Sequence, residues 1–148
     1  MGIDMRFDGL DELIKQCQKH SSKEFIEKVD RKLLKECGMR TKVKVSSRML
    51  RSADVSKSGR KGSRPGIHSA DAVPVSGVRK KGHRLYIIVG WDKGDNSPYF
   101  YTKFNEFGTS KRSPFPVFLP ATKEAYRELE AMRVAEYEKL LKFLEGEM

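Results

Sequence analysis

Residues 21–37 read SSKEFIEKVDRKLLKEC, and this stretch predicts a long helix in the N-terminal half of the chain. Ser21 and Glu24 form a capping-box pattern, in which a hydroxyl and a carboxylate satisfy backbone N–H groups at the start of a helix. Apolar side chains then recur at helical spacing, at Phe25, Ile26, Val29, Leu33 and Cys37. The pattern predicts a long helix that continues to about Arg51 or, alternatively, breaks at Gly38.

The residues before this helix predict another, shorter one. Asp8 is a candidate N-cap, and the apolar side chains after it fall on one helical face, at Leu10, Leu13, Ile14 and Cys17. A short helix is therefore expected to end near His20. Cys17 and Cys37 both lie in predicted helices, where a small buried thiol is more common than a disulfide.

Beyond residue 72 the pattern changes from helix to strand. Residues 73–78 and the run RLYIIVGW at Arg84–Trp91 are rich in β-branched and aromatic side chains, which favour strands. The basic segment Arg79–His83 is predicted to be the turn between these two strands. After a second turn at Asp92–Pro98, aromatic and polar residues alternate over Tyr99–Phe107, which predicts a third strand or an extended edge.

The last predicted element is a long helix at Ala121–Glu145, with Gly146 as a C-terminal stop signal. Pro114, Pro116 and Pro120 are expected to keep the residues before this helix irregular. The predicted fold class is α+β, with two N-terminal helices, a small antiparallel sheet of about three strands and a long C-terminal helix. A length of 148 residues fits a single domain spanning 1–148.

The net charge of +10 is concentrated in the middle of the chain. Residues 40–84 hold 13 basic side chains against two acidic ones, Asp54 and Asp71, which gives this segment a net charge of +11. Within it, residues 52–72 are too polar to bury much apolar area, so a long, basic, flexible loop is expected there. No run approaches the roughly 18 apolar residues of a membrane span, which predicts a soluble protein without membrane contact.

The basic side chains of this segment are candidates for contact with DNA or with an acidic protein partner. They are Lys57, Arg60, Lys61 and Arg64 in the loop, and Arg79, Lys80 and Lys81 in the predicted turn. If these groups converge in space, they would bind phosphates with strong salt dependence and without sequence preference. Because the loop carries no aromatic side chain to stack on bases, DNA and an acidic partner remain equal alternatives.

The sequence contains few residues that could form a catalytic or metal site. Cys17, His20 and Cys37 supply at most three metal ligands. His68 and His83 lie in basic surroundings, without a nearby acid to orient either ring. The expectation is therefore a protein that is not an enzyme and that has no cofactor and no metal.

Residues 98–121 read PYFYTKFNEFGTSKRSPFPVFLPA, and this segment resembles the head-tail joining, or tail-completion, family of long-tailed bacteriophages. Members of that family show a Tyr-rich strand that leads to Glu-Phe-Gly-Thr-Ser, and then a loop of the form Pro-Phe-Leu-Arg-Pro-Ala that opens the last helix. Leu119 stands here where the family has arginine, and Val117-Phe118 replaces its Phe-Leu pair. Because the order of the other elements also fits, the resemblance covers most of the chain.

The resemblance implies a virion structural protein of a phage or prophage neck, made in the cytoplasm of the host bacterium. Such a subunit would form a homo-oligomeric ring between portal and tail, contact other neck and tail proteins, and lie near the genomic DNA that passes through the channel. The residues implied in subunit or partner contact are Phe107, Gly108, Thr109, Ser110, Phe115, Pro116 and Phe118.

The phenylalanines of this segment have two competing roles, internal packing and contact with another subunit. Phe104 and Phe107 are expected to pack the last helix onto the sheet, whereas Phe115, set between prolines, is the better candidate for an outside contact. The alternative function for the whole chain is a small basic nucleic-acid-binding protein that uses residues 40–84.

Overall fold

The computed structural model describes residues 22–146 except 60, 63, 92–96 and 100. The first predicted helix, from Asp8 to His20, and Cys17 lie outside the described residues. Within the described part the chain is mixed helix and sheet, with two long helices, a shorter third helix and a two-stranded antiparallel sheet. None of the described helices is long and apolar enough to cross a bilayer.

Helix α2, Lys23–Arg48, confirms the long helix predicted from residues 21–37. Its N-cap is Ser22 rather than Ser21, because the Ser22 Oγ accepts a hydrogen bond from the Phe25 N–H at 3.2 Å. The helix continues through Gly38 without the alternative break, and it ends at Arg48 rather than near Arg51.

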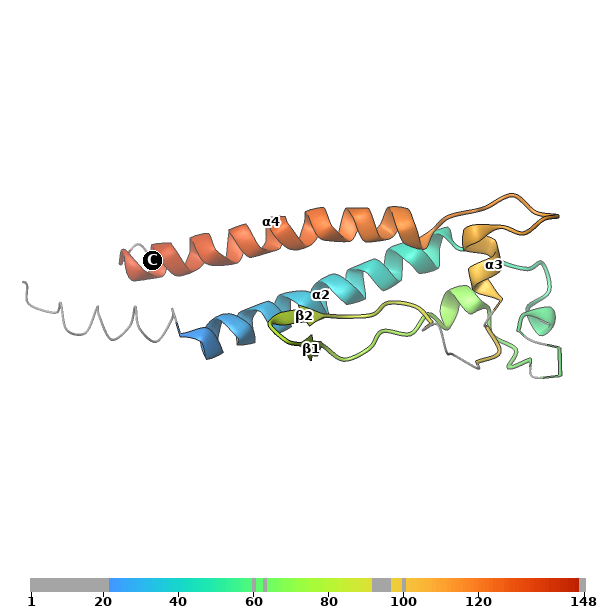
Figure 1. Cartoon of the computed structure of the whole chain (residues 1–148), viewed down its shortest axis with the longest axis horizontal. Coiled ribbons are helices and arrows are strands. Elements are labelled where there is room, and N and C mark those ends of the chain that lie inside the picture. Colours follow the sequence, from blue (N-terminus) through green and yellow to red (C-terminus); the bar gives the residue numbers. More distant parts are fainter. Residues whose placement is uncertain (1–21, 60, 63, 92–96, 100, 147–148) are drawn as a thin grey trace, which may run out of the picture.

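Helix α4, Phe118–Leu144, is the predicted C-terminal helix, and it lies alongside α2 in the opposite direction (Figure 1). It starts at Phe118 instead of Ala121, so Pro120 occupies its first turn. Proline is tolerated there because the N–H that it lacks would have no partner within the helix. The two helices together define the long axis of the molecule (Figure 1).

The two strands form a hairpin beside α2 (Figure 1). β1, Arg79–Lys81, pairs antiparallel with β2, Arg84–Tyr86, and an isolated bridge between Val75 and Val89 continues the pairing. The hairpin confirms the first two predicted strands in outline. The turn is shorter than the expected Arg79–His83, because the first three residues of that segment are themselves paired as β1.

The predicted third strand at Tyr99–Phe107 is wrong, because Thr102–Phe107 is the short helix α3. Tyr99 and Thr102 are both buried, and the Thr102 hydroxyl donates a hydrogen bond to the Tyr99 carbonyl at 3.0 Å. The Tyr99 ring also contacts Trp91, with centroids 5.7 Å apart. Alternation favours a strand, but the buried residues Tyr99 and Thr102 lie three positions apart, a spacing that suits one side of a helical turn.

The segment 52–72, predicted to be a flexible loop, is attached by hydrogen bonds to two tyrosine side chains just before α3. It contains two short 3-10 turns, at Val55–Lys57 and Ser69–Asp71. The Tyr99 hydroxyl donates to the Ile67 carbonyl at 2.7 Å, and the Gly59 N–H donates to the Tyr101 hydroxyl at 3.2 Å. These bonds place the basic loop and α3 together at one end of the long axis (Figure 1).

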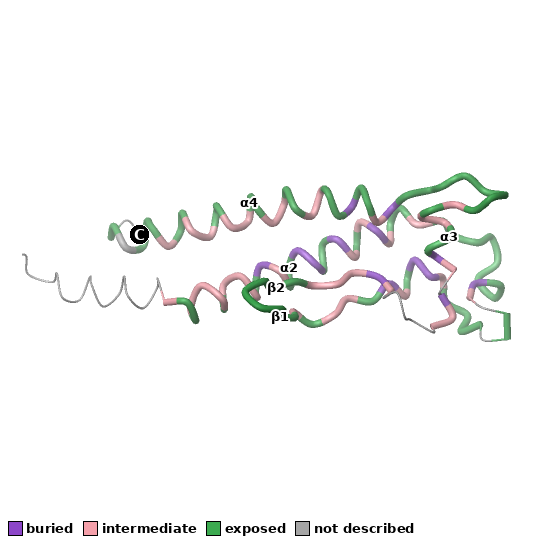
Figure 2. The backbone as a smooth tube through the Cα atoms, viewed as in Figure 1, coloured by how far each residue is buried: buried purple, intermediate pink, exposed green. Residues whose placement is uncertain are grey.

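The hydrophobic core lies where the end of α2 meets the start of α4 and the segments around them. Its members are the buried residues Val45, Val73, Val117 and Ala121, with Met49, Val89, Trp91 and Phe118 packed around them. Figure 2 shows buried residues from the middle of α2 towards the loop end, whereas the far ends of both helices are intermediate or exposed. The two helices are therefore best packed near α3.

Ion pairs join α2 to α4. Arg48 pairs with Glu124 at 2.8 Å, and Lys44 contacts both Glu124 and Glu128. The hydrogen bond from Arg48, with another from Lys44, holds the pKa of Glu124 below its ordinary value of 4.5. A carboxyl group whose pKa is lowered by folding stabilises the folded state at pH values above the pKa that the group has in the unfolded chain. That stabilisation is lost as the pH falls through the folded pKa.

Acid is therefore expected to destabilise the protein partly through Glu124. The free energy of unfolding, measured by urea denaturation, should fall from about pH 5 towards about pH 3, and the Glu124→Gln variant should show less of this fall. Glu145→Gln, at an exposed position beyond the ion pairs, is the matched control. Identical acid profiles for Glu124→Gln and the wild type would contradict the role of this ion pair.

Candidate functional site

The segment Gly108–Pro116 forms a tight loop between α3 and α4. Thr109 and Arg112 pair as an isolated bridge, with N–H to carbonyl distances of 2.9 and 3.2 Å. Gly108 has φ 75° and ψ 178°, a conformation that is essentially restricted to glycine. A Cβ at Gly108 would lie 2.8 Å from the backbone N of Pro114 and 2.9 Å from the Arg112 carbonyl oxygen. The loop can therefore adopt this conformation only with glycine at position 108.

Glu106 fixes the other side of this loop. Its Oε2 accepts hydrogen bonds from the N–H groups of Val117 at 2.7 Å and Phe118 at 3.1 Å, and its Oε1 accepts from Leu119 at 2.9 Å. The carboxylate thus satisfies N–H groups that have no partner within α4, and its charge favours the positive end of the helix dipole. Sequence reasoning missed this role, although Glu106 is the only acidic residue between 97 and 123.

Two of the predicted contact residues are exposed to solvent, one at the end of α3 and one in the loop after it. Phe107 is 80% exposed and Phe115 is 46% exposed, so the expectation that Phe107 packs the last helix onto the sheet is wrong. Phe104 is likewise exposed. Phe107 ends α3 and precedes Gly108, and no sheet reaches it because the third strand is absent from the described residues.

The remaining predicted contact residues divide between surface and core. Thr109, Ser110 and Pro116 are exposed along the loop. Phe118 is instead partly buried and packs against the core, and its ring contacts Trp91 edge-on with centroids 6.4 Å apart. The exposed set is therefore a compact group carried by the end of α3 and the loop after it.

The two predicted basic groups do not form one surface. Lys57, Lys61 and Arg64 are exposed on the loop at one end of the long axis, whereas β1 lies near the middle of the molecule (Figure 1). Lys80 is paired with Glu27 of α2 at 2.7 Å. Arg60 lies outside the described residues.

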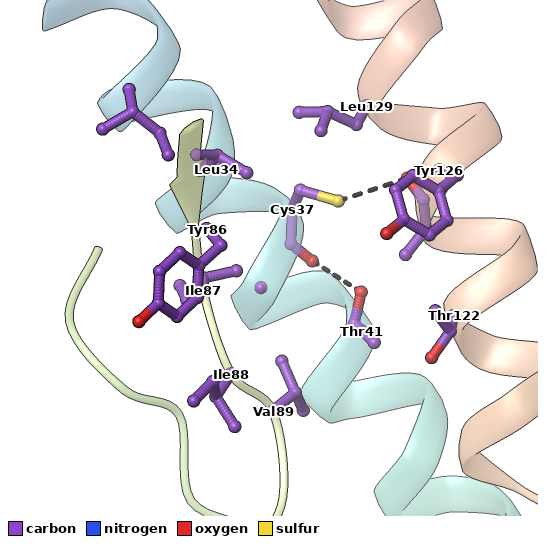
Figure 3. A pocket seen from close by; sticks show the side chains of 13 residues that line it. Leu34, Cys37, Thr41, Tyr86, Ile87, Ile88, Val89, Thr122, Tyr126 and Leu129 are labelled. Carbon is purple, nitrogen blue, oxygen red and sulfur yellow. Dashed lines mark hydrogen bonds between the residues drawn. The ribbon is translucent and has the colours of Figure 1, made fainter. Parts of the chain in front are cut away.

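A groove of about 380 Å³ lies between α2, α4 and the strand segment around β2 (Figure 3). Gly38 permits the close approach of this segment, because a Cβ there would lie 2.7 Å from Ile87 Cδ1. Cys37, at the floor, is buried as predicted, and its thiol donates to the Ala125 carbonyl at 3.5 Å. Burial raises the pKa of this thiol, which keeps it protonated and unreactive near neutral pH.

The described residues contain no group of three or more His, Cys, Asp or Glu side chains that could hold a metal ion. Comparisons with protein-family models, with curated proteins and with solved structures find no match for this chain. Function is therefore inferred from the motif at residues 98–121 and from the geometry of the loop that this motif forms.

Proposed function

We propose that the chain is a structural subunit of a phage neck, a head-tail joining or tail-completion protein that is not an enzyme. The subunit assembles as a ring between portal and tail and contacts other neck and tail proteins. The observation that carries this proposal is the exposure of two aromatic side chains within the segment that resembles the family, Phe107 at the end of α3 and Phe115 in the loop after it.

The rigidity of this loop suits an assembly contact. The glycine turn at Gly108 and the Glu106 cap restrain the two sides of the loop before any partner arrives. A surface that is ordered in advance loses less conformational entropy on binding, and exposed aromatic side chains often supply most of the binding energy. Leu119, where the family has arginine, is also exposed, so this position offers an apolar side chain to solvent instead of a charged one.

The test is to purify intact phage particles from the source strain and to look for this polypeptide by mass spectrometry. Presence at a low copy number, as for one ring per particle, is the expected result. Absence from complete, tailed particles would discard the neck proposal. The alternative, a nucleic-acid-binding protein that uses residues 40–84, would then be tested by measuring DNA affinity against salt concentration.

A further inference from the structure

We propose that the α3 end of one copy docks on an exposed stripe of α4 of the next copy. The α3 end is defined by Lys103, Phe107, Lys111 and Phe115. The α4 stripe is defined by Glu130, Val134, Glu138 and Leu141. This inference rests on the proposed function, because it names the two surfaces through which the subunits of the ring would meet.

The α3 end combines positive charge with exposed aromatic area. Lys103 precedes Phe107 by one helical turn in α3, and Lys111 lies in the loop close after it; all three are exposed. Lys103 Nζ lies 5.4 Å from the centroid of the Phe104 ring. Glu106, the only carboxylate in residues 97–123, is engaged by the backbone of α4 and faces inward to that helix. The α3 end therefore favours an acidic surface that also offers apolar contacts.

The α4 stripe carries exposed carboxylates and exposed apolar side chains, which complement the positive charge and the aromatic rings of the α3 end. Its residues recur at spacings of three and four, which places them on one face of the helix. Val134 is 52% and Leu141 is 58% exposed, and the Glu130 side chain is 73% exposed. Glu130 and Glu138 lie one turn before and one turn after Val134, so each apolar side chain of the stripe has a carboxylate beside it.

The net charge of the C-terminal part of α4 also favours a positively charged partner such as the α3 end. Residues 128–145 hold five acidic side chains and three basic ones, a net charge of −2. One of the basic ones, Arg133, lies 3.5 Å from Asp30 of α2 and 3.9 Å from Glu130 of the stripe, and another, Lys139, lies 3.8 Å from Glu136. The Glu130 side chain remains 73% exposed beside Arg133, so an incoming cationic surface can still reach its carboxylate.

The placement of the two surfaces makes the contact intermolecular. The α3 end lies at one end of the long axis, and the C-terminal part of α4 reaches the other end (Figure 1). A single copy cannot bring them together, because the straight helix α4 separates them. Two different patches of one subunit that meet in the next subunit form a heterologous contact, which closes into a ring or extends into a filament.

The experiment uses sedimentation equilibrium of the full chain and two charge-reversed variants. One variant carries Lys103→Glu and Lys111→Glu, and the other carries Glu130→Lys and Glu138→Lys. Each variant alone should self-associate at least about tenfold more weakly than the wild type, because like charges then face each other. An equimolar mixture should recover association, because each variant offers the charge that the other now requires.

Lys81→Glu, at an exposed position of β1 outside both surfaces, is the matched control and should associate like the wild type. Circular dichroism of every variant checks that the helices are intact. A wild type that stays monomeric at up to about millimolar concentration, unchanged association of both variants, or a mixture without recovery would each overturn the proposed contact.

Two further outcomes separate this contact from other readings. Loss of DNA binding by Lys103→Glu and Lys111→Glu, with self-association unchanged, would assign the α3 end to nucleic acid and overturn the contact with a second copy. Detection of the chain in tailed particles, together with failure of the charge-reversal test, would leave the neck function standing and remove only these interface surfaces.

Discussion

Gly108→Ala is expected to destabilise the protein by about 2 to 4 kcal/mol. Two costs combine in this variant. The backbone at Gly108, with φ 75° and ψ 178°, lies in a region that side-chain-bearing residues rarely adopt. The added Cβ would also lie 2.8 Å from the backbone N of Pro114 and 2.9 Å from the Arg112 carbonyl oxygen. Neither neighbour is a flexible side-chain tip, so the loop itself must open.

The measurement for Gly108→Ala is the free energy of unfolding by urea denaturation. The matched control is Gly77→Ala, because a Cβ at Gly77 meets nothing within 4 Å and its φ lies outside the left-handed region. The control should change stability by less than about 1 kcal/mol in either direction. Equal stabilities of the two variants would show that the loop does not depend on the glycine.

Glu106→Ala is expected to cost about 2 to 3 kcal/mol of stability. The substitution removes three hydrogen bonds from the N–H groups of Val117, Phe118 and Leu119 to one charged carboxylate. It also removes a negative charge from the positive end of the α4 dipole. Since Val117 is part of the core, loosening of the first turn of α4 should disturb the packing there as well.

The measurement for Glu106→Ala is again urea denaturation, with two comparison variants. Glu106→Gln keeps one acceptor oxygen and loses the charge, so its stability should fall between those of Glu106→Ala and the wild type. Glu145→Ala removes an exposed glutamate at the far end of α4, the helix that Glu106 caps, and should change stability by no more than about 0.5 kcal/mol. If Glu106→Ala were as stable as Glu145→Ala, the contacts of Glu106 with the start of α4 would contribute nothing to stability.

Both substitutions bear on the proposed assembly role. Gly108 and Glu106 flank Phe107, and together they determine where the loop after α3 leaves that helix and where α4 begins. A chain that folds but carries either substitution should present Phe107 and Phe115 less uniformly. Weaker self-association is therefore expected even in variants that retain their helices.

Local signals in the sequence are enough to predict three elements of the fold. The capping residues and apolar periodicity after residue 21 specify α2, and the apolar spacing beyond Ala121 specifies most of α4. The β-branched residues around a short turn specify the hairpin. Each of these signals is contained within one element, so no knowledge of distant contacts was needed.

Contacts between residues far apart in the chain accompany α3, the Glu106 cap and the separation of the basic groups. The pattern at Tyr99–Phe107 predicted a strand, whereas Thr102–Phe107 is the helix α3 and Tyr99, just before it, packs against Trp91. Glu106 caps a helix that begins twelve residues later, and its role exists only because the loop folds back. Contacts between residues far apart in the chain leave no local periodicity, and for this reason the sequence named Phe107 and Phe115 of the candidate site but not Glu106 or the arrangement of these residues.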